Sequence, residues 1–115
     1  MKKIYYLSTC DTCKRIMKEL PLDDFIKVDI KTDPLTENDL IELHGLSGSY
    51  EVLFSKIARL YRSMNLKEKN LQEVDFKKYL LEHYTFLKRP IFIIDNEVFI
   101  GNAKKNIELV KSKLA

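Results

Sequence analysis

Two cysteines, Cys10 and Cys13, are the residues of this chain with the clearest potential for chemistry, and the chain has no others. They stand in a Cys-Asp-Thr-Cys motif directly after a short apolar segment, residues 4–7. In a helix that begins at this motif the two sulfurs lie one turn apart, close enough to form a disulfide. The N-terminus of such a helix presents N–H groups and the positive end of its dipole to the first sulfur, which favours the thiolate. The motif therefore predicts Cys10 as a nucleophile.

Cys13 would then act as the resolving thiol. It lies on the apolar stripe of the expected helix, together with Ile16, Met17 and Leu20, so it should be less exposed than Cys10. From that place its thiol can attack a mixed disulfide or a sulfenic acid on the first cysteine and close an internal disulfide. The alternative role of this residue is that of a small core residue.

A C-x-x-C pair can also bind zinc, but a structural zinc site needs four ligands. The remaining soft ligands are His44 and His83, and neither stands at zinc-finger spacing. We expect His83 on an apolar helical stripe, as a core residue, and His44 at a helix end before Gly45. No metal ion and no bound cofactor are therefore expected.

Length and composition narrow the class of protein. A chain of 115 residues predicts one domain with an ordinary hydrophobic core. The apolar segment near the N-terminus is too short for a signal peptide, and no apolar run approaches a membrane span. We expect a cytoplasmic monomer, and in the cytoplasm a cysteine pair is catalytic, redox-sensing or metal-binding.

The net charge is +3, and the lysines are spread along the chain. Such lysines most simply form a solvated surface, and the alternative is a basic rim for an anionic substrate or partner. The sequence has no basic recognition helix, zinc-finger spacing or aromatic RNA-binding motif, so direct binding of nucleic acid is not expected.

The N-terminal third predicts a βαβ unit. Residues 2–7 are rich in Ile and Tyr and predict a strand. A helix should follow, capped by Thr9 or Asp11 and ended by Pro21. Residues 25–30 alternate apolar and charged side chains, the period of a half-buried strand.

The middle of the chain predicts helices. Thr36-x-x-Asp39 resembles a capping box that opens a short helix, which Gly45 should close. Apolar residues then recur at helical spacing, which predicts a longer helix over residues 48–64, ended by Asn65. A further helix is expected over residues 75–84.

The C-terminal part returns to strands. Residues 91–94 are continuously apolar, as in a strand buried on both faces. A turn at residues 95–96, a strand at 98–100 and a turn at 101–102 lead to a last helix that carries Ile107, Val110 and Leu114. The order of elements predicts an α/β fold into which a helical block is inserted.

Arg89-Pro90 directly precedes that buried strand. Proline lacks the N–H that a central strand needs, so it must occupy the first position of the strand. Two interpretations stay open: a simple helix breaker, or a cis-proline whose loop faces the cysteines. In the second case Arg89 brings a permanent positive charge toward the same place.

The order and separation of these features resemble the arsenate reductase family of the thioredoxin-like class, which includes the Spx-type redox regulators. The resemblance runs nearly end to end, from the strand–Cys-x-x-Cys–helix start through the helical insert to LKRPI at residues 87–91 and the closing hairpin and helix. It implies a thioredoxin-like fold in a single domain, with a mixed four-stranded sheet and a helical insertion at about residues 34–86.

The resemblance also implies roles for residues. Cys10 takes the position of the catalytic cysteine, and Arg89 that of an arginine that helps to hold the oxyanion. Pro90 takes the position of the cis-proline. The expected substrate-binding residues are Pro90, the three neighbours Thr9, Asp11 and Thr12 of Cys10, and Lys56, which best matches a second oxyanion arginine, with Arg59 nearby.

Three departures from the enzymes matter. The glutaredoxin-coupled reductases usually have no cysteine at position 13. Lys56 replaces an arginine, and a lysine is a point charge rather than a fork for a tetrahedral oxyanion. Gly101-Asn102 stands where a third arginine is expected, which resembles the regulators instead.

The implied function is that of a thiol-dependent oxidoreductase, acting on arsenate or on protein disulfides. Glutathione with glutaredoxin, or thioredoxin, would be the external thiol donor. The alternative is a redox-sensing regulator that docks on RNA polymerase, through its α subunit. In the regulators a glycine before the long middle helix serves this docking, and Gly48 stands there.

Overall fold

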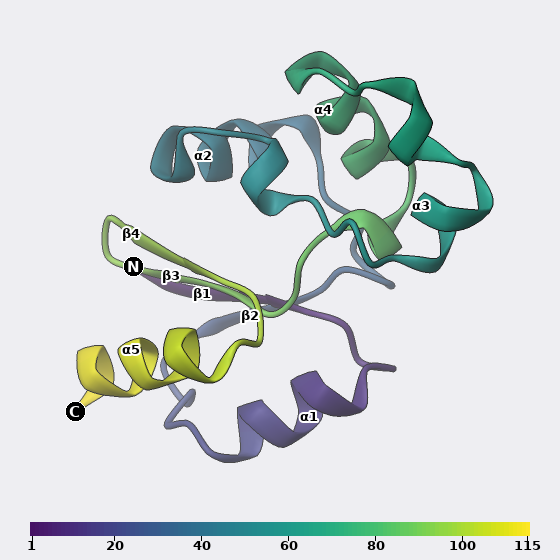
Figure 1. Cartoon of the computed structure of the whole chain (residues 1–115). Helices are drawn as coiled ribbons and strands as arrows, with labels where there is room; N and C mark the ends of the chain where they lie inside the picture. Colours follow the sequence, from purple (N-terminus) through teal and green to yellow (C-terminus); the bar gives the residue numbers. More distant parts are fainter. The chain divides into compact units, whose positions relative to one another are not determined.

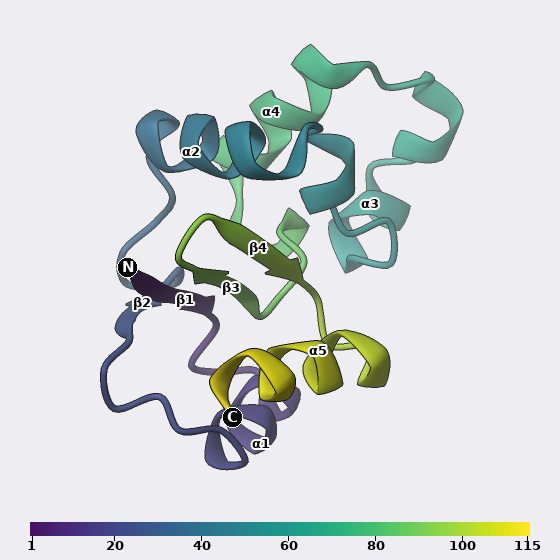
Figure 2. The same cartoon turned by 90° about the vertical axis from the view of Figure 1, so that its left-hand side faces the viewer.

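The computed structural model describes residues Met1–Ala115, and the chain divides into two compact units. The first unit combines Met1–Asp33 with Arg89–Ala115, and the second is Pro34–Lys88. The second unit covers the segment where the sequence predicts an inserted helical block. Figures 1 and 2 show the elements of each unit.

A mixed four-stranded sheet forms the centre of the first unit. Its strands are β1 (Lys2–Tyr6), β2 (Ile26–Asp29), β3 (Ile91–Ile94) and β4 (Glu97–Ile100), in the order β2-β1-β3-β4. β1 and β2 run parallel, and the other two pairs are antiparallel. All four residues of β3 are buried, as the apolar run predicts. The predicted α/β class and sheet are therefore confirmed.

Two helices, α1 (Asp11–Lys18) and α5 (Lys104–Leu114), lie on one face of this sheet (Figures 1 and 2). Their apolar stripes pack against strand residues in one core, because each helix has a single apolar side to bury. The core joins residues from both helices, from the sheet and from the segment between α1 and β2: Ile4, Ile16, Leu20, Leu22, Phe25, Phe92, Ile94, Phe99, Ile107 and Val110.

The β3–β4 hairpin turns at Asp95, as predicted. Asp95 has a left-handed backbone with φ of 56°, which short polar residues tolerate in tight turns. Its N–H donates to the carbonyl of Met1 at 2.7 Å, and its carboxylate accepts from the N-terminal ammonium at 3.2 Å. The hairpin is therefore tied to the start of β1.

Helix α2 (Glu37–Ser47) opens the second unit with the predicted capping box. The Asp39 N–H donates to the Thr36 hydroxyl at 3.1 Å, and the Thr36 N–H donates back to the Asp39 carboxylate at 2.9 Å. The prediction that Gly45 closes this helix is wrong. The helix continues to Ser47 and ends at Gly48, whose left-handed φ of 84° suits a glycine at a helix end.

The long helix predicted over residues 48–64 does not form. A short 3-10 turn, η1 (Glu51–Leu53), is followed by an extended residue, Phe54, and only then by α3 (Arg59–Ser63). Phe54 pairs with Leu87 as an isolated β-bridge, and the Ser55 N–H donates to the Phe86 carbonyl at 2.7 Å. These long-range bonds replace helical ones, so tertiary pairing overrides the helical spacing.

The next helix, α4 (Glu73–Glu82), begins two residues earlier than predicted, after a short 3-10 turn, η2 (Leu66–Lys69). His83 is not a core residue on its stripe, because the helix ends before it and its side chain is exposed. Its ring nitrogen Nδ1 accepts from the N–H of Thr85 at 3.0 Å at the start of another 3-10 turn, η3 (Tyr84–Phe86).

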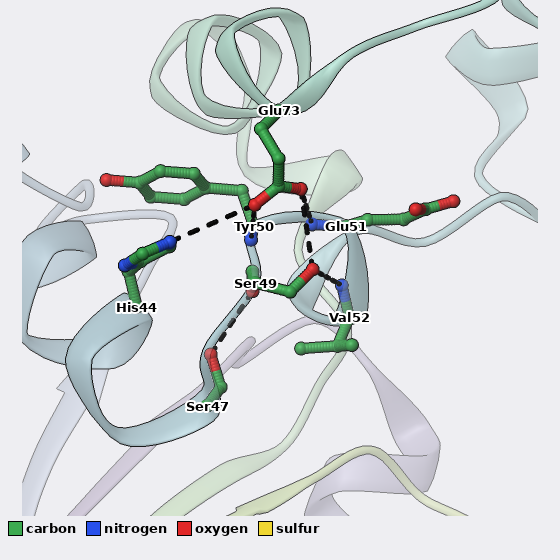
Figure 3. A network of polar contacts seen from close by, with 7 residues as sticks. All are labelled: His44, Ser47, Ser49, Tyr50, Glu51, Val52 and Glu73. Atoms are coloured by element: carbon green, nitrogen blue, oxygen red, sulfur yellow. Dashed lines mark hydrogen bonds and ion pairs between the residues drawn. The ribbon is translucent and has the colours of Figure 1, made fainter.

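A carboxylate joins α4 to the turn that follows α2 (Figure 3). Glu73 accepts hydrogen bonds from the N–H groups of Tyr50 at 2.8 Å and Glu51 at 3.0 Å, and from the Ser49 hydroxyl at 3.4 Å. The His44 imidazole lies 3.9 Å away, near the C-terminus of α2. The contacts hold together segments that are far apart in the sequence.

None of the helices has both the length and the apolar character that a membrane-spanning helix needs.

Candidate active site

Cys10 stands where β1 gives way to α1. Its N–H donates to the Leu7 carbonyl at 3.0 Å, which closes a tight turn, and its carbonyl accepts from the Lys14 N–H at 3.1 Å, which opens the helix. Cys10 is therefore the N-cap of α1, with an extended backbone (φ −92°, ψ 113°). Neither Thr9 nor Asp11 takes the cap position that the sequence predicts for one of them.

The surroundings of Cys10 favour its thiolate. Partial burial by itself raises the pKa of this cysteine, but the N–H and thiol of Cys13 and the guanidinium of Arg89 act against it and together lower the pKa. The side chain of Cys10 makes no capping hydrogen bond to the first turn of α1.

Cys13 has the opposite environment. Its side chain is fully buried on the core side of α1. Burial raises the pKa of Cys13 to about 11, and the nearby Cys10 sulfur adds to the rise, while the backbone of Leu7 and the charge of Arg89 oppose it. Both cysteines are reduced. At neutral pH the pair therefore has one thiol prepared to ionise and one that holds its proton.

Arg89 and Pro90 belong to the same unit as the cysteines. The Arg89-Pro90 peptide bond is cis, so the open choice between a simple helix breaker and a cis-proline is decided for the second. Pro90 is buried, and its carbonyl accepts from the Gly101 N–H at 2.9 Å. The guanidinium of the half-buried Arg89 lies near the sulfur of Cys10, and its charge lowers the pKa of that thiol.

The three neighbours of Cys10 differ in exposure. Thr9 is exposed in the turn before the helix, Asp11 is the exposed first residue of α1, and Thr12 is half-buried. They flank Cys10 in sequence, and substrate contact by each stays a prediction.

Lys56 and Arg59 lie in the second unit. The helix expected to carry both does not form: Lys56 stands in a turn after η1, and Arg59 is the exposed first residue of α3. The Lys56 ammonium donates to the carboxylate of Glu51, a hydrogen bond that raises the pKa of the lysine. Its charge is therefore already paired within the second unit.

One residue near the site has no signal in the sequence. The carboxylate of Asp29, at the end of β2, accepts from the N–H of Ser8, two residues before Cys10, at 3.2 Å. The strand pattern predicts Asp29 only as a polar position. Its hydrogen-bond partner can be identified only once the parallel register of β1 and β2 is known.

The structure holds no group of three or more His, Cys, Asp and Glu residues that could bind a metal ion.

Two known proteins are similar to this chain in sequence. An uncharacterized protein of Haemophilus influenzae is 30% identical over 112 residues, which cover 94% of this chain and 96% of that one. The global transcriptional regulator Spx 2 of Bacillus anthracis is 23% identical over 105 residues, 88% of this chain and 79% of that one.

Solved structures share the fold. The YFFB protein aligns over 100% of both chains with a TM-score of 0.82 and 18% identity. An arsenate reductase from Vibrio cholerae aligns over 96% of this chain and 95% of its own, with a TM-score of 0.75 and 15% identity. A model of the ArsC family matches residues 5–110, nearly the whole chain. The cysteine at the start of α1 and the cis-proline before β3 both lie within the matched residues. The chain therefore belongs to the ArsC family.

Proposed function

We propose that the protein is a thiol-dependent oxidoreductase in which Cys10 attacks the substrate and Cys13 resolves the intermediate. The observation that carries the proposal is the placement of the two thiols: Cys10 is the half-buried N-cap of α1 near Arg89, and Cys13 is fully buried one turn further along the helix, which lowers the pKa of the first thiol and raises that of the second. A nucleophile needs the thiolate at neutral pH. A resolving thiol must stay protonated and protected until the first step has occurred.

With a disulfide substrate, the Cys10 thiolate attacks one sulfur, and the other sulfur leaves as a thiolate and takes up a proton. Cys13 then loses its proton and attacks the Cys10 sulfur. The second substrate thiol leaves, and a Cys10–Cys13 disulfide remains. Two electrons have passed to the substrate, and an external donor, glutathione with glutaredoxin or thioredoxin, returns them to the protein.

With arsenate, the Cys10 sulfur attacks arsenic and one oxygen leaves as water. Arg89 steadies the remaining oxygens, because its fork of N–H donors and fixed charge suit an oxyanion. A second thiol, from Cys13 or from the donor, then attacks the Cys10 sulfur. The S–As bond breaks with its electron pair on arsenic, and arsenite is released.

The test is arsenate-dependent oxidation of NADPH, coupled through glutaredoxin and glutathione or through thioredoxin and its reductase. We expect turnover with one of the donors and its complete loss in Cys10→Ser. No turnover with either donor would remove arsenate as the substrate. The wider proposal then depends on Cys13→Ser, which should leave protein partners trapped on Cys10 as mixed disulfides that dithiothreitol releases.

A second candidate function is a redox-sensing regulator that binds RNA polymerase. The resemblance to Spx 2 supports it, together with the second cysteine at position 13. Capture of the polymerase α subunit by the immobilised protein tests it, with Gly48→Arg expected to abolish the capture. Because Gly48 has a left-handed φ, Gly48→Asn, which tolerates that backbone, is the matched control. This function is refuted when the oxidised and the reduced protein both fail to capture the subunit.

A further inference from the structure

Asp29 ties the end of β2 to the chain that leads to the nucleophile. Its carboxylate oxygen Oδ1 accepts from the N–H of Ser8 at 3.2 Å and from the N–H of Lys31 at 3.2 Å. The hydroxyl of Ser8 also donates to this carboxylate, and the three hydrogen bonds together outweigh the cost of burial, so that the pKa of Asp29 lies below its usual value. The group is therefore a charged acceptor at neutral pH.

The tether acts on the turn that ends at Cys10. That turn runs from Leu7 to Cys10, closed by the Cys10 N–H on the Leu7 carbonyl at 3.0 Å, and Ser8 is one of its two central residues. The backbone of Leu7 hydrogen-bonds to the sulfur of Cys13, while the last residue of the turn supplies the other sulfur. The Cys10 thiol is thus part of this short turn, and the Cys13 thiol is in contact with it.

The ionisation of Cys10 depends on donors at close range. The N–H and thiol of Cys13 and the guanidinium of Arg89 lower its pKa only while the sulfur stays within their reach. Catalytic groups generally need placement to within about 0.5 Å, supported by a second layer of hydrogen bonds. A carboxylate that accepts both donors of Ser8 is such a support.

We propose that Asp29 is a positioning residue for Cys10, which holds the Leu7–Cys10 turn so that the sulfur faces its donors. The proposal rests on the function proposed above, because it concerns the reactivity of the same thiol. Asp29 acts through Ser8 and the turn, and it does not itself contact substrate.

The sign of the effect separates positioning from simple electrostatics. Asp29 is negative, so removal of its charge alone would make a nearby thiolate easier to form and would lower the pKa of Cys10. Loosening of the turn moves the sulfur away from its donors and raises that pKa. Asp29→Ala and Asp29→Asn both remove the charge, but only the asparagine keeps an oxygen that can accept from Ser8.

The experiment measures the rate of iodoacetamide alkylation at Cys10 against pH, resolved by mass spectrometry, in the full reduced chain. The variants are Asp29→Ala, Asp29→Asn and the control Asp24→Asn, which removes an exposed carboxylate of the same unit that pairs with Lys2 at 3.0 Å. Circular dichroism and a urea titration establish that each variant is folded under the conditions of the assay.

We expect Asp29→Ala to move the alkylation profile to higher pH and to slow the reaction at pH 7 by about threefold to tenfold. Asp29→Asn, which loses the charge and keeps an acceptor for Ser8, should overlap the wild type or move to lower pH, and Asp24→Asn should match the wild type. Where Asp29→Ala fails to fold, Asp29→Val, which suits a strand and has no acceptor, carries the test, again with a shift to higher pH. An alanine or valine profile that overlaps the wild type, or moves to lower pH, overturns the positioning role.

The wild-type profile distinguishes this failure from failure of the proposed function. When wild-type Cys10 reacts faster than free cysteine and Asp29→Ala does not change it, only the positioning role is lost. When wild-type Cys10 reacts no faster than free cysteine, the proposed function is lost and the role of Asp29 with it.

Discussion

Cys10 and Cys13 carry the same side chain on one turn of helix, yet they differ in burial and in the donors around them. The helix N-terminus and Arg89 favour the thiolate of the first, whereas the core surrounds the second and raises its pKa to about 11. The sequence predicts the pair from its spacing and the order of reaction from the helix N-terminus and the apolar stripe. The sequence left open whether Arg89 faces the cysteines, and the fold shows that the positive charge at Cys10 comes from this residue.

At the residue scale, we predict that Arg89→Ala slows alkylation of Cys10 at pH 7 by about threefold to tenfold, because a charge that favours the thiolate is removed. Arg89→Lys should retain part of the rate, since the charge remains but the fork of donors does not. Alkylation of Cys10 against pH checks both. Arg62→Ala, an exposed guanidinium in α3, is the control and should leave the rate unchanged. An Arg89→Ala profile equal to the control contradicts the prediction.

At the element scale, two predictions from local side-chain chemistry hold, and one prediction from periodicity fails. The Thr36–Asp39 capping box and the hairpin turn at Asp95 form as predicted, because both depend on side chains acting on their own backbone. The long middle helix fails, because Phe54 bonds to a strand-like segment more than thirty positions further along the chain. Apolar residues of this segment such as Phe54 are buried in the core, although the chain there forms no long helix.

The two glycines of α2 should respond in opposite directions to alanine. Gly45 lies inside the helix with nothing within 4 Å of a new Cβ, so Gly45→Ala should stabilise the protein by about 0.5–1 kcal/mol. Gly48 has the left-handed φ of the helix end, so Gly48→Ala should destabilise it by about 1 kcal/mol. Urea unfolding monitored by circular dichroism measures both. Equal signs for the two variants would refute the assigned helix end.

Glu73 should contribute to the stability of the second unit. Its carboxylate accepts from two successive backbone N–H groups, and Glu73→Ala leaves both without this partner (Figure 3). Because the side chain is half exposed, we expect a loss of about 1–2 kcal/mol rather than the full worth of charged hydrogen bonds. Glu73→Gln keeps an acceptor and should lose less. Glu82→Ala, on the exposed end of α4, is the control in the same urea titration.

At the scale of the whole molecule, the chain combines a sheet unit that holds the cysteines with a helical unit inserted into it. The insertion begins at Pro34 and returns at Lys88, directly before the arginine of the site. The two ends of the sequence thus supply one sheet, and they bring Arg89 into the same unit as the two cysteines. That both units act together as a single domain stays a prediction.

The stability of the reduced protein should fall in alkaline solution because of Cys13. Its pKa is about 11 in the folded chain, against about 8.5 when unfolded. Between these values the unfolded state has lost a proton that the folded state keeps, so the free energy of unfolding falls as pH rises, by at most about 1.4 kcal/mol per pH unit. Urea midpoints from pH 8 to pH 10.5 measure this decline. Cys13→Ala should show a shallower one, and an equal slope in both proteins would contradict the prediction.

The sequence by itself determined the cysteine pair at the start of a helix, the position of the proline before a buried strand, the βαβ beginning and the closing hairpin. Each of these depends on residues close together in the chain, where spacing, turn chemistry and caps act locally. The tertiary structure alone decided the path of residues 48–64, the isomer of the Arg89-Pro90 bond and the partnership of Asp29 with Ser8. These follow from contacts between segments distant in sequence, which no local pattern encodes.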